Sequence, residues 1–480
     1  MNLKPSLLNA PLSVINVGVD SFNASVSAHG GSVVQVNWQP PGNADPGLAW
    51  RLAQLLGDLG DPASVGSRID QANASAVQRV IAAQPVLVDV ALHARDVWPD
   101  MDRTLLHAGA PVAWDDMCGP MHGAMIGAVL YEGWAESMAQ AQSMLAAGEI
   151  RFAQCHDYSA VGPMTGIISP SMPVLVVRNQ THGNLAYTNI NEGIGKILRF
   201  GANSPEVIER LRWFENMLAP AMRAAVKARG GIDLKSIQSQ ALLMGDEVHS
   251  RNVAATSLFF MQLAVGLSQC DIERSQMHEV LRFVADTSQF FLNLSMAAAK
   301  ATMDAAHGIE YSSTVTAIAR NGVTTAIRVS GLGKRWFEAP SGRPQGLYFP
   351  GFTEADANPD LGDSAITETA GFGGFSFAAS PALTLLAGGS IAASIEYSRL
   401  MYQITDGRNP ANSLPAMDFA AAPVGIDVRK VVDTGIQPVV TTGIAHREAG
   451  VGQIGAGIVR VPMACFVKAL EALAQTYLPL

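Results

Sequence analysis

The spacing of hydrophobic residues changes along the chain and divides it into three parts. In the first part, the β-branched runs LSVINVGV (12–19), SVVQVNW (32–38) and PVLVDVAL (85–92) are typical of strands. Segments with helical character lie between them, the first at residues 21–31. This alternation predicts a Rossmann-like α/β domain over residues 10–190.

The second part has helical periodicity. Residues 204–231 are amphipathic, begin with an N-cap candidate and a proline at the first helical position, and end with a pair of glycines. The same periodicity continues through residues 234–268 and 272–306 with little strand signal. A mainly helical domain is therefore expected over residues 191–308.

The third part returns to strand-like alternation. The segment TVTAIARNGVTTAIRVSG (314–331) has two alternating runs around Asn321-Gly322, a pair typical of a type I′ hairpin turn because both central residues need positive φ. Glycine-rich loops and a helical pattern at 461–476 follow. We expect an α+β domain with a β-hairpin over residues 309–480, in a multidomain chain that combines α/β and α+β parts.

Composition and charge narrow the classes of function. Of the 480 residues, 48% are hydrophobic and 15% are charged, so we expect part of the surface to be covered in a homo-oligomer or by partner subunits. The net charge of −9 leaves no basic stripe for nucleic acid. No apolar run reaches the roughly 18 residues of a membrane span, and no signal peptide is recognisable, so a cytoplasmic protein without membrane association is expected. The four cysteines lack CxxC spacing, which indicates neither a zinc site nor a disulfide framework.

The stretch LLMGDEVHSRNVAATSLFF places charged groups within an otherwise apolar region. If it is helical, Asp246, His249 and Asn252 share one stripe, and Glu247 and Arg251 share another. Polar groups in a row on an apolar helix are costly to bury without partners, which favours a ligand-binding or catalytic face. For the second stripe, an intrahelical ion pair is an equally good interpretation.

Two loops before and after residue 190 supply further candidates. His156 and Thr165 lie in QCHDYSAVGPMTG, after a strand-like run where α/β sheets place ligands. Asn191, Glu192 and Arg199 lie in NINEGIGKILRFG, where backbone N–H groups and cations can hold an anion. Simple loop packing or helix capping explains each group about as well.

Two glycine-rich stretches suit an anion. In LGDSAITETAGFGGF, Asp363, Ser364 and Thr367 precede three glycines, a combination that fits either a phosphate or carboxylate cradle or an ordinary turn.

The second stretch, GVGQIG, is a literal GxGxxG that contains Gly452 and Gly455, but too few residues follow it for a dinucleotide-binding unit. His446 and Arg447, just upstream, can still lie beside a glycine-lined anion pocket.

Several long motifs in order resemble one known family. The chain is similar over about residues 11–475 to the YlbE-like, or AllG-like, family, through the blocks INVGVDSF, VVQVNWQPP, MCGPMHGAMIGAVLYEGWA, NEGIGKILRFG, MGDEVHSRNVAATS, GLGKRWF, NPDLGDSAITETAGFGGF, GIDVRKV and TGIAHREAGVGQIGAGIV.

The resemblance implies a subunit of an oxamate carbamoyltransferase in anaerobic allantoin breakdown. Its partners would be an FdrA-type protein, which is similar to the alpha subunit of succinyl-CoA synthetase, and a further small subunit. The implied reaction converts oxalurate and phosphate into oxamate and carbamoyl phosphate. The family supplies no set of catalytic residues that can be transferred to this sequence.

The residues themselves suggest how this chemistry is distributed. A cation is needed for the substrate carboxylate, a base for the amide proton, and cations or N–H groups for phosphate. We expect Arg251 or Arg447 to bind the carboxylate and His249 or His446 to transfer the proton, with Asp246 beside them. The glycine loops at 362–374 and 450–457 are expected to bind phosphate, and no metal or other cofactor is required.

Two alternatives of other classes remain. In one, the chain is a non-catalytic scaffold or substrate-gathering subunit of an FdrA-containing complex. In the other, it is a metal-dependent hydrolase of a small amide that uses Asp246, His249 and His156 as ligands.

Overall fold

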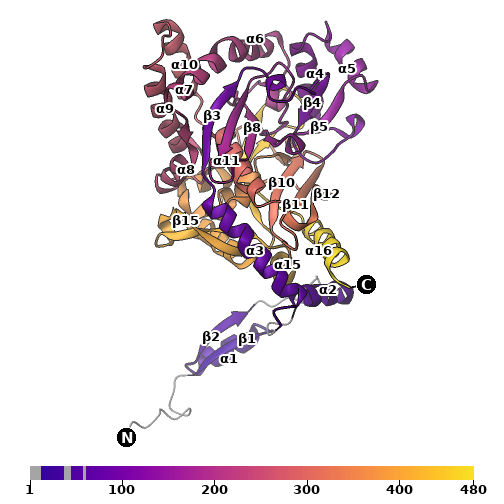
Figure 1. Ribbon diagram of the computed structural model, residues 1–480. Helices are drawn as coiled ribbons and strands as arrows, with labels where there is room; N and C mark the ends of the chain where they lie inside the picture. Colours follow the sequence, from indigo (N-terminus) through magenta and orange to yellow (C-terminus); the bar gives the residue numbers. More distant parts are fainter. Residues whose placement is uncertain (1–11, 37–44, 58–60, 480) are drawn as a thin grey trace.

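The computed structural model describes residues 12–36, 45–57 and 61–479, and shows a mixed α/β body with a small N-terminal unit beside it (Figure 1). This confirms the expected combination of helices and sheets. None of the helices in the described ranges is long and apolar enough to cross a membrane.

The N-terminal unit is a parallel βαβ element. It consists of β1 (Ser13–Val17), α1 (Ser21–Ala28) and β2 (Ser32–Val36). The Asn16 side chain donates to Asn23 of α1 (3.0 Å) and to Gln35 of β2 (2.7 Å), and these bonds hold the helix to one face of the strands. The expected strand, helix and strand over residues 12–38 are therefore confirmed within the described residues, and the other face of this sheet is exposed.

A five-stranded sheet lies at the centre of the body. Its strand order is β6-β8-β7-β3-β9, and only the β6–β8 pair is parallel. The strands are β3 (Pro85–Ala91), β6 (Ala160–Val161), β7 (Val174–Asn179), β8 (Leu185–Asn189) and β9 (Ile232–Asp233). A separate parallel pair joins β4 (Thr104–His107) to β5 (Arg151–Gln154). A Rossmann-like layer is not confirmed. The five-stranded sheet is mainly antiparallel, and the parallel pairs described outside it, β1–β2 and β4–β5, are each separate sheets of only two strands.

The central region is helical, as expected. The helix expected at 204–231 is present as α6 (Pro205–Trp213), a π-helical turn (Phe214–Leu218) and α7 (Ala219–Ala228). The wide turn ends two residues before Pro220, which has no N–H to donate to the preceding turn. The helices that follow are α8 (Leu234–Leu243), α9 (Val253–Leu267), α10 (Arg274–Asp286) and α11 (Phe291–Ala305).

The expected hairpin is present as β10 (Val315–Asn321) and β11 (Thr324–Val329). The predicted turn type is wrong. The two connecting residues are Gly322 and Val323, and of these only Gly322 has positive φ (80°), as in a type II′ turn. The turn therefore places glycine at its first central position instead of Asn321.

The C-terminal strands form three small sheets, with strand orders β12-β11-β10-β14, β13-β18-β17 and β15-β16. These strands are β12 (Phe337–Pro340), β13 (Gln345–Tyr348), β14 (Leu361–Gly362), β15 (Thr405–Leu414), β16 (Ala420–Ile426), β17 (Val439–Ala445) and β18 (Gln453–Arg460). The remaining helices are α2 (Pro46–Leu56), α3 (Val65–Ala82), α4 (Gly119–Tyr131), α5 (Met138–Ala146), α12 (Ile366–Thr369), α13 (Thr384–Ala387), α14 (Ile391–Met401), α15 (Val428–Thr434) and α16 (Met463–Tyr477).

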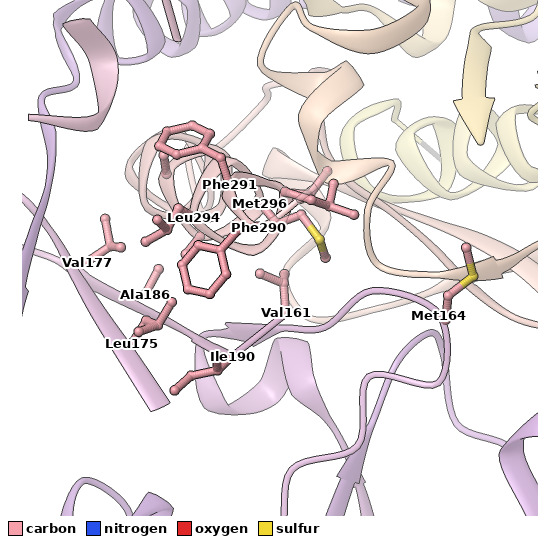
Figure 2. Packing of buried hydrophobic residues seen from close by; sticks show 14 of the residues in the cluster. Val161, Met164, Leu175, Val177, Ala186, Ile190, Phe290, Phe291, Leu294 and Met296 are labelled. Carbon is pink, nitrogen blue, oxygen red and sulfur yellow. The ribbon is translucent and has the colours of Figure 1, made fainter. Parts of the chain in front are cut away.

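The buried helix α11 organises the main hydrophobic core. Figure 2 shows Phe291, Leu294 and Met296 of α11, together with Phe290 just before it, beside side chains of the central sheet such as Leu175. Fourteen of the fifteen residues of α11 are buried, so the helix forms a fixed base for loops at its N-terminal end. The candidate site lies at that end.

Candidate functional site

A small polar cavity lies where loops from distant parts of the chain meet. It is lined by Pro163, Met164, Arg199, His249, Ser250, Gln289, Leu292, Ser364, Gly443, Gln453 and Ala456. The cavity therefore combines residues of all three sequence regions, from the loop after β6 to strand β18.

The segment that contains His249 is a loop, so the expected helix over residues 242–260 is wrong. Helix α8 ends at Leu243 and α9 begins at Val253. Gly245 (φ 92°) and Val248 (φ 63°) both adopt the left-handed conformation, which interrupts a right-handed helix. The polar residues between the helices consequently do not form the two expected stripes.

His249 is held by a buried carboxylate. Its Nδ1 atom lies 2.8 Å from Oε1 of Glu368, and the His249 side chain is 3% exposed. Since Nδ1 faces the carboxylate, Nε2 is the ring nitrogen left to exchange a proton with a ligand in the cavity. A histidine oriented by a carboxylate in this way is a recurring arrangement for acid–base catalysis.

Glu368 is itself fixed by three other donors. The backbone N–H groups of Gly374 (3.2 Å) and Thr441 (3.1 Å) bind Oε1, and the Thr367 hydroxyl binds Oε2 (3.0 Å). At Gly373, a Cβ atom would lie 1.9 Å from Glu368 Oε1, so glycine is required for the close approach. The glycine-rich stretch thus positions the carboxylate of Glu368, a residue that is not among the site residues predicted from the sequence.

Arg199 is buried in the wall of the cavity, and no described carboxylate pairs with its side chain. Its Nη2 donates to the carbonyl of Gly193, whereas Nε and Nη1 have no hydrogen-bond partner among the described residues. Burial lowers the pKa of Arg199 to about 10, which still leaves the guanidinium charged at neutral pH. Buried cations are normally paired, so two free N–H groups beside a cavity indicate a site for an anion.

Two predicted residues support the loop that carries Arg199. Glu192 accepts hydrogen bonds from the backbone N–H groups of Leu198 (2.9 Å) and Arg199 (3.1 Å). Burial raises the pKa of Glu192. Asn191 accepts from Gly193 N (2.8 Å) and donates to the Gln289 carbonyl (2.9 Å). Both side chains therefore hold backbone in place, as the capping interpretation proposed.

Ser364 faces the cavity with a free hydroxyl proton. Its Oγ accepts from Nη2 of Arg320 (3.3 Å), whose own charge is balanced by Asp360 (2.8 Å). The hydroxyl can then donate to a ligand oxygen. The Thr367 hydroxyl instead shares its one hydrogen between the Ser364 carbonyl (2.7 Å) and Glu368 (3.0 Å), and so lies behind the cavity wall.

Asp246, Arg251 and Asn252 do not line this cavity. Asp246 accepts from Ala255 N (2.9 Å) and pairs with Arg251 (3.3 Å). The expected Glu247–Arg251 ion pair is wrong, because the Glu247 carboxylate instead accepts from the Arg251 backbone N–H (2.9 Å). The loop is thus held together by its own polar side chains, with Asn252 donating to the His249 carbonyl.

The predicted residues in and before the GxGxxG match also lie outside the cavity lining, although Gln453 of the same stretch belongs to it. His446 Nδ1 accepts from the Glu448 N–H (2.9 Å), and the Arg447 N–H donates to the Asp356 carbonyl (2.8 Å). A Cβ atom on Gly452 would lie 2.8 Å from the Gly195 carbonyl oxygen, and one on Gly455 2.4 Å from the Leu347 carbonyl oxygen. Close backbone packing therefore accounts for both glycines.

The remaining predicted residues, Asp363, His156 and Thr165, do not belong to the cavity lining. Asp363 accepts from Gly109 N (2.8 Å) and Gly162 N (3.2 Å), and lies 3.5 Å from His156. Thr165 is buried, and its hydroxyl has no partner. Within the described ranges, no three His, Cys, Asp or Glu side chains are grouped as metal ligands, so Asp246, His249 and His156 do not converge.

The chain that carries these residues is similar to known proteins. AllG of Escherichia coli (strain K12), described as an oxamate carbamoyltransferase subunit, is 50% identical over 412 residues, and the match covers 85% of this chain and 98% of AllG. The chain belongs to the AllG family. A family model described as oxamate carbamoyltransferase subunit AllG matches residues 150–364, which include Arg199, His249 and Ser364.

Two further relatives of this AllG family member extend the comparison. YahG of Escherichia coli (strain K12), described as an uncharacterized protein, is 44% identical over 476 residues and covers 99% of this chain and 100% of YahG. The crystal structure of a conserved protein of unknown function from Enterococcus faecalis V583 is 45% identical, with a TM-score of 0.84, and covers 86% of this chain and 99% of that chain. The fold of the body is therefore shared with an experimentally determined structure.

Proposed function

We propose that this AllG family member is a catalytic subunit of an oxamate carbamoyltransferase, and that the cavity between Arg199, His249 and Ser364 is its active site. The reaction would interconvert oxalurate and phosphate with oxamate and carbamoyl phosphate in anaerobic allantoin breakdown. The observation that carries the proposal is the charged, buried Arg199, with two unpartnered nitrogens beside a histidine that a carboxylate orients.

The charges of the cavity suit this reaction. Both oxalurate and phosphate are anions, and Nε and Nη1 of Arg199 can each donate a single charge-assisted hydrogen bond to an anion oxygen. The Ser364 hydroxyl and the carboxamide of Gln453 provide donors for the oxygen that becomes negative in the tetrahedral intermediate. We assign the substrate carboxylate to Arg199.

His249 would move one proton. A phosphate oxygen attacks the carbamoyl carbon of oxalurate, and the bond from this carbon to the bridging nitrogen breaks. Hydrogen phosphate loses a proton, and the leaving nitrogen of oxamate gains one. Neutral His249 can take the proton at Nε2 and return it to nitrogen, while Glu368 stabilises the transient imidazolium.

The partners remain part of the proposal. We propose an assembly with an FdrA-type protein and a further small subunit, because the relative AllG is described as a subunit. In the alternative of a non-catalytic scaffold, the cavity would gather substrate without contributing to turnover.

The test compares Arg199→Met with Arg251→Met in the assembled complex, with phosphate-dependent formation of carbamoyl phosphate from oxalurate as the assay. A hydrogen bond to a charged group contributes roughly 1.5 to 3 kcal/mol, so Arg199→Met should lower kcat/KM by about 10- to 150-fold or more. Arg251→Met should have little effect, because Arg251 lies outside the cavity lining. Equal losses in both variants would contradict the assignment of the carboxylate to Arg199.

The catalytic role has a separate test. His249→Ala in the same complex should abolish turnover without preventing assembly. If His249→Ala retains the wild-type kcat, the chain is a scaffold and the catalytic residues lie in a partner subunit.

A further inference from the structure

A second group of unpartnered polar atoms lies outside the lining of the Arg199 cavity. Four buried or half-buried side chains of the described chain contribute hydrogen-bonding atoms that meet no protein partner, and we refer to them as the His156 cluster: His107, His156, Arg328 and Trp336. Buried polar atoms are rarely left without a partner, and several of them in one place indicate water or a ligand.

The members of the His156 cluster are close to one another. The Arg328 guanidinium carbon lies 4.1 Å from the centre of the Trp336 ring, and the His156 ring meets the same indole at right angles with a centroid distance of 5.2 Å. His107 is within electrostatic reach of both Asp157, which pairs with Arg328 (2.6 Å), and Asp363. The Trp336 ring thus contacts both Arg328 and His156, and His107 shares the neighbouring carboxylates Asp157 and Asp363 with them.

The cluster offers two acceptors. His107 Nδ1 lies 2.8 Å from the Ala108 carbonyl, so this nitrogen carries the proton and Nε2 keeps a lone pair. His156 Nε2 is directed at the Asp363 carboxylate (3.5 Å), which favours a proton on Nε2 and leaves the lone pair on Nδ1. Burial lowers the pKa of both histidines, which agrees with neutral rings.

The cluster also offers two donors. Nε of Arg328 and Nε1 of Trp336 each carry a hydrogen and have no acceptor in the part of the chain that the structure describes. The positive charge of Arg328 is already balanced by Asp157, and Asp363 adds a negative charge nearby. The surroundings are therefore unsuited to a phosphate or carboxylate, and suited to a neutral ligand that both donates and accepts.

We propose that the His156 cluster binds a neutral carbamoyl group, the –CO–NH2 end of a small amide or urea. The NH2 hydrogens would donate to His107 Nε2 and His156 Nδ1, and the carbonyl oxygen would accept from Arg328 Nε and Trp336 Nε1. Only the identity of the natural ligand, a carbamoyl compound, rests on the proposed function; the binding of a carbamoyl group by the cluster does not. Because Asp363 precedes the cavity residue Ser364, the cluster lies next to the proposed active site.

Binding can be followed at the Trp336 indole in the full-length protein. With 15N-labelled tryptophan, the Trp336 N–H resonance is identified by its absence from Trp336→Phe, a change that keeps the ring against Arg328. N-methylurea, a neutral carbamoyl probe, should shift this resonance in a saturable manner, whereas inorganic phosphate should not. The apparent Kd for N-methylurea should rise by about 5- to 10-fold or more in His156→Phe, since a neutral hydrogen bond is lost.

Controls separate this proposal from local damage and from the proposed function. His182→Phe, at an exposed histidine, should leave the Kd unchanged, and Arg328→Met provides a second cluster variant that should weaken binding if His156→Phe fails to fold. Arg199→Met should retain the N-methylurea response even if Arg199 has no catalytic role. Absence of a saturable shift in the wild type would mean that the cluster holds ordered water only, and a shift with phosphate would mean an anion site; either result would overturn the proposal.

Discussion

Nδ1 of His249 and Oε1 of Glu368 lie 2.8 Å apart, although 119 residues separate them in the sequence. The same carboxylate oxygen accepts the backbone N–H groups of Gly374 and Thr441, so its position does not depend on His249. The histidine can therefore change its protonation state while the carboxylate stays in place. Because the position of Glu368 does not depend on His249, the role of each residue can be tested by a separate substitution.

Replacing Glu368 by Gln should remove the charge that stabilises an imidazolium and keep the shape of the side chain. We expect kcat of the assembled complex to fall by about 100-fold, at the lower end of the usual contribution of acid–base catalysis, with little change in KM. Steady-state kinetics checks this outcome. An unchanged kcat would show that the His249–Glu368 pair is structural.

His249→Ala should leave the fold nearly intact. Glu368 keeps three donors without the imidazole, so no buried carboxylate is stranded, and the usual penalty of about 1 to 3 kcal/mol for an unsatisfied buried group is avoided. The thermal midpoint and carbamoyl transfer should be measured on one preparation. A large fall in the midpoint, with activity retained by the folded fraction, would assign His249 a structural role.

Arg199→Met should not destabilise the ligand-free protein, and is expected to stabilise it slightly. The substitution replaces a buried, incompletely paired cation by an apolar side chain of similar length. Oxamate or phosphate at millimolar concentration should raise the thermal midpoint of the wild type and have no effect on the variant. A ligand-induced rise of equal size in both proteins would place the anion elsewhere.

The buried Glu247 predicts a pH dependence of stability. Burial raises its pKa to about 7, with the nearby His249 opposing this shift. Between about pH 4.5 and 7, Glu247 keeps its proton in the folded state and loses it in the unfolded state. The stabilisation of the fold by this proton is therefore complete below about pH 4.5 and is lost as the pH rises to about 7. One pKa unit corresponds to about 1.4 kcal/mol, so the loss is of the order of 3 kcal/mol.

Urea unfolding between pH 4.5 and 8 measures this effect. Glu247→Gln keeps hydrogen-bonding atoms at the same place but cannot ionise, so its free energy of unfolding should decline less across that window than the wild-type value. Equal slopes for the two proteins would show that Glu247 does not titrate with a raised pKa.

Local patterns predicted the elements that local interactions determine. The βαβ unit, the amphipathic helix at 204–231 and the hairpin at 314–331 were all predictable, because periodicity and capping residues operate within a few turns of chain. The sheet order was not predictable, since β7 and β8 pair antiparallel and the short strand β9 joins from the helical region. Pairing between distant strands leaves little trace in one sequence.

Three residues of the candidate cavity were among those predicted from the sequence. Arg199, His249 and Ser364 were candidates because their residue types suit anion and proton chemistry, and the structure brings them to one cavity. Glu368 was missed, because its role depends on a contact 119 residues away. The helical interpretation of the His249 segment failed because apolar composition on both sides concealed the left-handed residues Gly245 and Val248.

The donor from Thr441 has a consequence for the synthesis of the protein. The carboxylate that orients His249 is anchored by the backbone of β17 (Val439–Ala445), and the cavity also takes residues from β18 (Gln453–Arg460). A ribosome that has completed the helical region and even Glu368 has therefore not yet made all the parts of the candidate cavity. The cavity can be complete only when nearly the whole polypeptide has emerged, so nascent or prematurely terminated chains lack part of its lining.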